Sequence, residues 1–243
     1  DKLLDGINLV GINKIVGIDN FITSKRQEEY TDNIKYDFIE SDLINFDFNK
    51  LDKFDTVIHL ASLASPVYYK KYPLETIDIG VTVTRKLLEK CKDWNAEFIF
   101  FSSSEIYGNP PSENIPTTED FKGSVSCQGP RSCYSESKRL GETLCYIYNK
   151  KYNVNTKIIR PFNIYGPDIY IYSDYRMIPN LIKSTLRQQP VSIYGSGTQT
   201  RTFCYYTDAI DGIIKVISNG DYGETYNIGN DKPEISMIDL VKL

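Results

Sequence analysis

The fold is decided by residues 96–105, AEFIFFSSSE. The first six of these residues are almost all apolar, which is the pattern of a central parallel strand that is buried on both faces of a sheet. Polar residues begin at Ser102 and continue to Glu105, at the carboxyl end of the expected strand. Open α/β sheets bind their ligands at the carboxyl ends of strands, so this segment predicts a parallel sheet and also the position of its site.

Strand-like and helix-like segments alternate on either side of this run. Strands are expected at residues 14–19, 34–39, 55–60, 96–102 and 155–162. Helices are expected at residues 73–92, 130–152, 177–188 and 207–218, the last capped by Thr207 or Asp208. This order predicts an α/β fold with a Rossmann-like, doubly wound parallel sheet that has helices on both faces.

The chain changes character after residue 163. Short strand-like runs at 191–194, 202–206 and 225–228 alternate with loops rich in Gly, Tyr and Asp. We therefore expect a Rossmann-like domain over residues 1–165 and a smaller substrate-binding lobe over residues 166–243.

The two ends of the chain look like interior parts of this fold. Residues 1–4 resemble the last turn of a helix, residues 236–243 lie inside a helix-like pattern, and the spacing of Gly6, Gly11 and Gly17 is not that of a dinucleotide-binding turn. We expect both domains to be incomplete, without the first strand and its glycine loop. The alternative is a variant fold that begins at the second strand.

Composition narrows the possible functions. The chain has 28 Lys and Arg against 32 Asp and Glu, a net charge of −4, which offers no footprint for nucleic acid or an anionic membrane. Its five cysteines form no CxxC pair and indicate free thiols in a reducing cytoplasm. The single histidine, His59, excludes multi-histidine metal sites, and no metal is expected. Proton transfer therefore falls mainly to Tyr, Lys, Glu or Asp.

Tyr134 and Lys138 form a YxxxK pair within the expected helix 130–152. The i,i+4 spacing places both on one helix face, and a nearby ammonium group favours the phenolate, so we expect Lys138 to lower the pKa of Tyr134. At the end of the buried strand, the Ser103 hydroxyl is suited to relay a proton, and Glu105 supplies a second acid or base. Taken alone, the YxxxK motif predicts only a surface pair, and the serine segment after the strand predicts only a turn. Because the two occur in this order along the chain, a catalytic site is favoured.

Several longer motifs resemble the extended short-chain dehydrogenase/reductase family, and within it the enzymes that modify nucleotide sugars. The general motifs are IVGIDNF (15–21), SDL (41–43), SSSEIYG (102–108), the YxxxK pair and RPFNIYGP (160–167). Three further segments resemble the UDP-glucuronate decarboxylase group: HLASLASPVYYKKYP (59–73), GPRSCYSESKR (129–139) and YGSGTQTR (194–201). Three positions depart from the pattern. Gly80 and Val83 stand where the family commonly has Asn and Gly, and Asp168 stands where the decarboxylases tend to have Arg.

The resemblance implies NAD as cofactor and a nucleotide sugar, most closely a UDP-sugar, as substrate. An acidic residue at the ribose suits NAD rather than NADP, because it repels a 2′-phosphate. The implied cofactor-binding residues are Asp19, Asn20, Asp42, Leu43, Leu60, Ala61, Ser62, Ser102, Tyr134 and Lys138. The implied substrate-binding residues are Tyr69, Ser104, Asn163, Arg176, Tyr194 and Arg201, and the implied catalytic residues are Ser103, Glu105, Tyr134 and Lys138. His59 is expected to be a packed strand residue.

The activity that the resemblance implies is transient oxidation of the sugar at C4, followed by decarboxylation of UDP-glucuronate to UDP-xylose, a step of polysaccharide biosynthesis. A nucleotide-sugar 4,6-dehydratase similar to GDP-mannose dehydratase remains an alternative. A 4-epimerase is a further alternative, although those enzymes commonly lack a glutamate at position 105. A remnant that only binds a nucleotide sugar is the alternative from outside the enzymes. The family also implies a homodimer, formed through helices 73–92 and 130–152.

Overall fold

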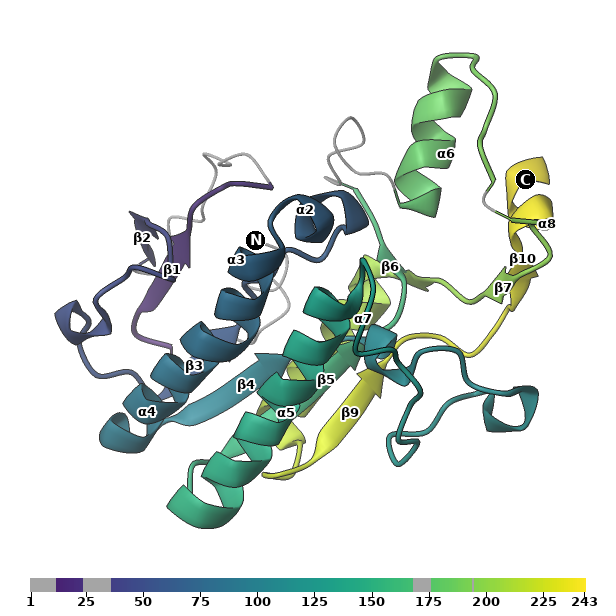
Figure 1. Cartoon of the computed structure of the whole chain (residues 1–243). Helices are drawn as coiled ribbons and strands as arrows, with labels where there is room; N and C mark the ends of the chain where they lie inside the picture. Colours follow the sequence, from purple (N-terminus) through teal and green to yellow (C-terminus); the bar gives the residue numbers. More distant parts are fainter. Residues whose placement is uncertain (1–11, 24–35, 168–175, 194) are drawn as a thin grey trace.

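A four-stranded parallel sheet lies at the centre of the protein (Figure 1). The computed structural model describes residues 12–23, 36–167, 176–193 and 195–243. The strands, in the spatial order β3-β4-β5-β9, are β3 (Thr56–His59), β4 (Glu97–Phe101), β5 (Thr156–Pro161) and β9 (Thr225–Ile228). This sheet confirms the predicted α/β class and the central position of residues 97–101.

A second, separate pair of parallel strands lies beside the main sheet. It consists of β1 (Ile15–Asp19) and β2 (Tyr36–Glu40), with Asp19 opposite Glu40. The prediction of a strand that ends in an acidic residue is confirmed by β1. The expectations for residues 1–4, Gly6 and Gly11 lie outside the described residues.

The alternation of side chains along β4 explains why helices cover both faces of the sheet. Phe98 and Phe100 are fully buried and pack with α4 (Thr84–Trp94) and α5 (Ser132–Tyr152). Ile99 and Phe101 point to the other face and pack with α7 (Tyr206–Asn219). Successive strand residues face opposite sides, so a run that is apolar throughout requires a cover on each side.

The expected helix 73–92 is divided into three parts. These parts are α3 (Pro73–Ile77), a π-helical turn, η2 (Asp78–Val83), and α4. A further short helix, α2 (Pro66–Lys71), precedes them. In the π-helical turn the Ile79 carbonyl accepts a hydrogen bond from His59 Nε2, 3.2 Å away. A Cβ at Gly80 would lie 2.8 Å from Ser137 Oγ on α5, so an Asn at this position would collide with that helix.

The part of the chain after residue 163 differs most from expectation. Residues 225–228 form β9 of the main sheet, paired in parallel with β5, so their assignment to a separate lobe is wrong. Residues 191–193 form no strand, and α7 begins at Tyr206 with Tyr205 as its cap in place of Thr207 or Asp208. The division of the chain at residue 165 otherwise stays a prediction.

Short elements complete the described structure. On the right of Figure 1, α6 (Met177–Leu186) and α8 (Met237–Lys242) lie away from the main sheet. The paired short strands are β6 (Ile164–Tyr165) with β8 (Cys204–Tyr205), and β7 (Thr200–Arg201) with β10 (Ile235–Ser236). Three 3-10 turns are η1 (Phe48–Lys50), η3 (Ser104–Tyr107) and η4 (Ser112–Asn114). Across the described ranges, no helix has both the length and the apolar character needed to span a bilayer.

Candidate active site

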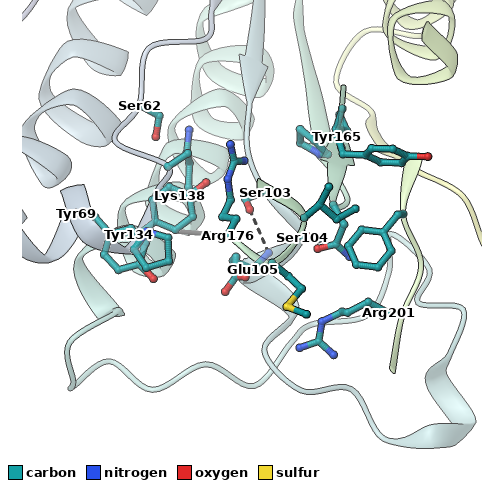
Figure 2. A pocket seen from close by; sticks show the side chains of 18 of the residues that line it. Ser62, Tyr69, Ser103, Ser104, Glu105, Tyr134, Lys138, Tyr165, Arg176 and Arg201 are labelled. Atoms are coloured by element: carbon teal, nitrogen blue, oxygen red, sulfur yellow. Dashed lines mark hydrogen bonds between the residues drawn. The ribbon is translucent and has the colours of Figure 1, made fainter. Parts of the chain in front are cut away.

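A cavity of about 500 Å³ opens at the carboxyl ends of β3, β4 and β5 (Figure 2). Its wall also includes residues of α2, α5 and α6, and Gln199 and Arg201 at β7. The structure brings together twelve of the predicted site residues here: Leu60, Ser62, Tyr69, Ser102, Ser103, Ser104, Glu105, Tyr134, Lys138, Asn163, Arg176 and Arg201. Tyr194 lies outside the described residues.

A smaller cavity of about 50 Å³ collects the other predicted cofactor residues. These are Asp19, Asn20, Asp42, Leu43 and Ala61. Ser62 lines both cavities, so the two are neighbours at the same edge of the molecule. Backbone amides orient the two carboxylates: Phe21 N donates to Asp19 Oδ1 at 2.7 Å, and Ile44 N donates to Asp42 Oδ1 at 2.9 Å.

The segment after β4 presents three serines and a glutamate to the larger cavity. Ser103 Oγ accepts a hydrogen bond from Glu105 N at 3.2 Å, which caps the 3-10 turn η3 (Figure 2). Ser102 Oγ is buried and has no hydrogen-bond partner among the described residues. A buried hydroxyl without a partner is costly unless a ligand or water satisfies it, so Ser102 fits a polar ligand in this cavity.

Tyr134 lies in the wall of the cavity and is 6% exposed. Its ring stacks on Tyr69, with 5.3 Å between the centroids and 17° between the planes. Burial is the largest influence on the pKa of Tyr134 and raises it, while a hydrogen bond with Ser103 and the charge of Arg176 lower it. The expected lowering of this pKa is therefore wrong for the protein without ligands, because desolvation of the phenolate outweighs the favourable contacts.

Lys138 is fully enclosed on the same face of α5. Its Nζ donates to the Phe101 carbonyl at 2.6 Å and lies 5.9 Å from the Tyr134 ring centroid. Burial lowers the pKa of Lys138 to about 8. The nearby Glu142 charge opposes this shift.

The prediction that His59 is a packed strand residue is confirmed. It is the last residue of β3, is 3% exposed and hydrogen-bonds to the Ile79 carbonyl. Burial, followed by the Lys138 charge, lowers the pKa of His59 to about 4. His59 is neutral at pH 7 and does not line either cavity.

The family model described as the NAD dependent epimerase/dehydratase family matches residues 3–229. The chain belongs to that family. It is 36% identical to UDP-glucuronic acid decarboxylase 4 of Arabidopsis thaliana, over 99% of this chain and 53% of that protein. It is 35% identical to UDP-glucuronic acid decarboxylase 3 of the same plant, over 100% of this chain and 68% of that protein. The chain thus spans about half the length of several curated relatives that it matches.

A solved structure is also similar to this epimerase/dehydratase chain. UDP-glucuronic acid 4-epimerase from Bacillus cereus, in complex with UDP-glucuronic acid and NAD, superposes with a TM-score of 0.78 at 29% identity. The superposition covers 99% of this chain and 77% of the other. The parallel sheet and its helices therefore have the arrangement of a known member of the group.

The predicted substrate-side residues of this epimerase/dehydratase differ in how they are held. Asn163 uses its side-chain amide to donate to the Thr202 carbonyl at 3.0 Å, which joins the end of β5 to the loop before β8. Arg201 donates from Nη1 to the Thr200 carbonyl at 2.7 Å and remains exposed. Arg176 lies close enough to Tyr134 to act on its pKa (Figure 2). With Arg131, which also lines the cavity, Arg176 and Arg201 bring three guanidinium groups to it.

Sequence reasoning missed several residues of the cavity wall in this family member. Arg131, immediately before α5, forms an ion pair with Glu105. Its signal was its place in the 129–139 segment, three residues before Tyr134. The other missed wall residues include Tyr165, Gln199, Phe203 and Met237. Tyr165 and Gln199 lie within the 160–167 and 194–201 motifs, which were the signal for them. Phe203 and Met237 lie in no quoted motif, and only the folded chain shows that they line the cavity.

Proposed function

We propose that this chain carries the active site of an NAD-dependent enzyme that oxidises a nucleotide sugar transiently at C4 and converts UDP-glucuronate to UDP-xylose. The observation that carries the proposal is one cavity that combines Tyr134, Ser103 and Glu105 with three guanidinium groups. Two relatives about equally similar to this chain, at 36% and 35% identity, are UDP-glucuronic acid decarboxylases. Fold similarity by itself decides nothing about substrate, so the argument depends on the site.

The residues that would hold NAD fit its chemistry. The two oriented carboxylates of Asp19 and Asp42 suit ribose hydroxyls and the adenosine end, and they disfavour a 2′-phosphate. The unpartnered Ser102 hydroxyl and the Lys138 ammonium group offer donors at the other end. When bound, NAD supplies an acceptor for the electron pair that leaves C4 of the sugar.

Tyr134 would accept the proton of the sugar 4-hydroxyl, with the Ser103 hydroxyl as its hydrogen-bond partner. The Ser103 bond and the Arg176 charge both lower the pKa of Tyr134, so they favour the ionised form against the opposing effects of burial and of the Glu105 and Tyr69 charges. The stack on Tyr69 fixes the ring plane and keeps water from that face. Restricting the base to one orientation is a large part of the catalytic effect of such a site.

A ketone at C4 turns the sugar acid into a β-keto acid. The C5–C6 bond then breaks, CO₂ leaves, and its bonding electrons enter the C4 carbonyl to give an enolate. Tyr134, now protonated, would donate a hydrogen bond to the enolate oxygen, and Glu105 would assist protonation at C5. Return of the hydride to C4 and of the Tyr134 proton to the C4 oxygen would then give UDP-xylose and restore both groups to their starting state. The guanidinium groups of Arg176 and Arg201 suit the carboxylate or diphosphate of the substrate, because a planar fork of donors matches both anions.

Mass spectrometry of UDP-glucuronate incubated with the protein and NAD⁺ tests this proposal. The expected result is loss of the mass of CO₂ and the NMR spectrum of UDP-xylose. The variant Tyr134→Phe is the matched control, because it removes only the hydroxyl and is expected to lose turnover while still binding NAD. Loss of the mass of water would indicate a dehydratase. The absence of both NAD binding and turnover would indicate a remnant that only binds a sugar or a partner.

A 4-epimerase is the second candidate, and one observation favours it. The similar Bacillus cereus structure is a UDP-glucuronic acid 4-epimerase, named with the same sugar acid. Both reactions begin with oxidation at C4 and diverge at the release of CO₂. A product of unchanged mass with inverted configuration at C4 would therefore replace the decarboxylase proposal by this one.

We also propose that the protein forms a homodimer through α3 and α5. These helices expose large apolar side chains among the described residues, including Leu74 at 71% and Tyr146 at 62%. An exposed apolar helix face is characteristic of an interaction site. Light scattering at micromolar concentration is expected to give the mass of two chains, and a monomeric mass would contradict the proposal.

A further inference from the structure

We propose that Arg131 is a positioning residue that holds the Glu105 carboxylate in the cavity beside Tyr134. This inference rests on the proposed function, in which Glu105 transfers a proton at C5 of the sugar. It concerns a residue that none of the catalytic motifs singles out. The inference starts from the Arg131–Glu105 ion pair, whose two members both line the larger cavity.

The ion pair joins the two elements that carry the proton-transfer groups. Arg131 Nη2 donates to Glu105 Oε2, although the two residues are 26 positions apart in the chain. The backbone carbonyl of Arg131 accepts hydrogen bonds from Tyr134 N at 3.1 Å and from Ser135 N at 3.2 Å, so Arg131 is fixed to the first turn of α5. On the other side, Glu105 N is bound to Ser103 Oγ. The geometry of Glu105 relative to Tyr134 is therefore set through Arg131.

The exposure of the pair argues for a role other than stability. The side chains of Arg131 and Glu105 are 56% and 45% exposed. Ion pairs this open to water contribute little to folding, because solvent screens the charges and two long side chains lose freedom. The pair still acts inside the site: after the dominant effect of burial, Arg131 lowers and Glu105 raises the pKa of the neighbouring Tyr69.

A free glutamate side chain samples many rotamers, and only some of them reach a given substrate atom. A guanidinium group selects one of these positions by donating a charge-assisted hydrogen bond to the carboxylate. Small misplacements of a catalytic group typically cost on the order of 100-fold in rate. We therefore expect the loss of Arg131 to affect turnover through Glu105, rather than through substrate affinity.

A double-mutant cycle tests the role of Arg131 with UDP-glucuronate as substrate and NAD⁺ present. Arg131→Ala is expected to lower kcat about 10- to 100-fold with little change in KM, and Arg131→Lys to restore most of this loss. In the background of Glu105→Gln, the same Arg131→Ala change is expected to have no further effect beyond about twofold, because the group it positions is already absent. Arg139→Ala, on α5 but outside the cavity wall, is the matched control for loss of a guanidinium group.

Three results would overturn the inference. Independent, multiplicative losses in the double variant, or a rise in KM for Arg131→Ala, would mean that Arg131 binds substrate itself. A fall in thermal stability that accounts for the lost activity, without rescue by lysine, would mean a structural role.

If the wild-type protein turns over none of the nucleotide sugars, the proposed function fails, and crystal structures decide the inference. The carboxylate of Glu105 should meet Arg131 in the wild type and leave its place in Arg131→Ala. An unpaired Glu105 in the wild type, or an unmoved one in the variant, would refute it.

Discussion

The replacement His59→Gln tests whether the main sheet keeps the His59 ring away from water and therefore uncharged. His59 is 3% exposed at the end of β3, and its ring centroid lies 5.9 Å from that of Phe100 and 6.3 Å from that of Phe98. Its Nε2–H donates to the Ile79 carbonyl at 3.2 Å. Burial, followed by the charge of Lys138, lowers the pKa of His59 from 6.5 to about 4.

The size of the effect follows from this displacement of the pKa. Between pH 6.5 and about 4 the unfolded chain binds a proton at His59 and the folded chain does not, so the free energy of unfolding falls as the pH falls through this window. The contribution is fully present above pH 6.5. Because the pKa is displaced from 6.5 to about 4, the free energy of unfolding is lower by about 3 kcal/mol at the acidic end of this window than above pH 6.5.

Urea denaturation of the wild type and of His59→Gln, at several pH values from 7.5 to 4, measures this contribution. Glutamine retains an amide donor for the Ile79 carbonyl but does not titrate. Subtracting the free energy of unfolding of the variant from that of the wild type at each pH therefore removes the contribution of all other acidic and basic groups. The wild type is expected to lose about 3 kcal/mol more than the variant on acidification. Parallel curves for the two proteins, or an NMR titration of His59 with a midpoint above pH 6, would refute the reasoning.

Three further changes give distinct outcomes. Lys138→Met should abolish turnover. Between pH 8 and 10.5 only the unfolded wild-type chain keeps the lysine proton, so the free energy of unfolding of the wild type should rise with pH, and the variant should lack this rise. Equal pH dependence of the two proteins in denaturation would contradict this. Gly141→Ala should cost about 1–3 kcal/mol, because its Cβ would lie 2.3 Å from Phe100 Cζ. The control Gly212→Ala on α7, with 3.2 Å to its nearest neighbour, should cost less in thermal denaturation. Asp19→Ser should weaken NAD binding and raise the ratio of NADP to NAD affinity, as measured by calorimetry; an unchanged ratio would remove Asp19 from the ribose site.

Much of the site was predictable because its signals are local. The apolar run at 96–101 requires burial on both faces, and parallel strands place their carboxyl ends at one edge. The i,i+4 spacing of Tyr134 and Lys138 places both on one helix face whatever the rest of the chain does. These two facts sufficed to predict that Ser103, Glu105, Tyr134 and Lys138 would share one cavity.

Properties that depend on the sum of distant contacts were decided by the tertiary structure. Residues 225–228 have the same strand pattern in a lobe or in the main sheet, and only pairing with β5 distinguishes the two. The direction of the Tyr134 pKa follows from desolvation by several elements, which spacing along one helix does not contain. The Arg131–Glu105 pair likewise requires the start of α5 to meet the end of β4. The sequence by itself thus determined which groups the proposed chemistry would use, because residue type and local spacing are properties of the sequence. Their protonation and orientation came from the tertiary structure, because solvent exclusion and long-range contacts exist only in the folded chain.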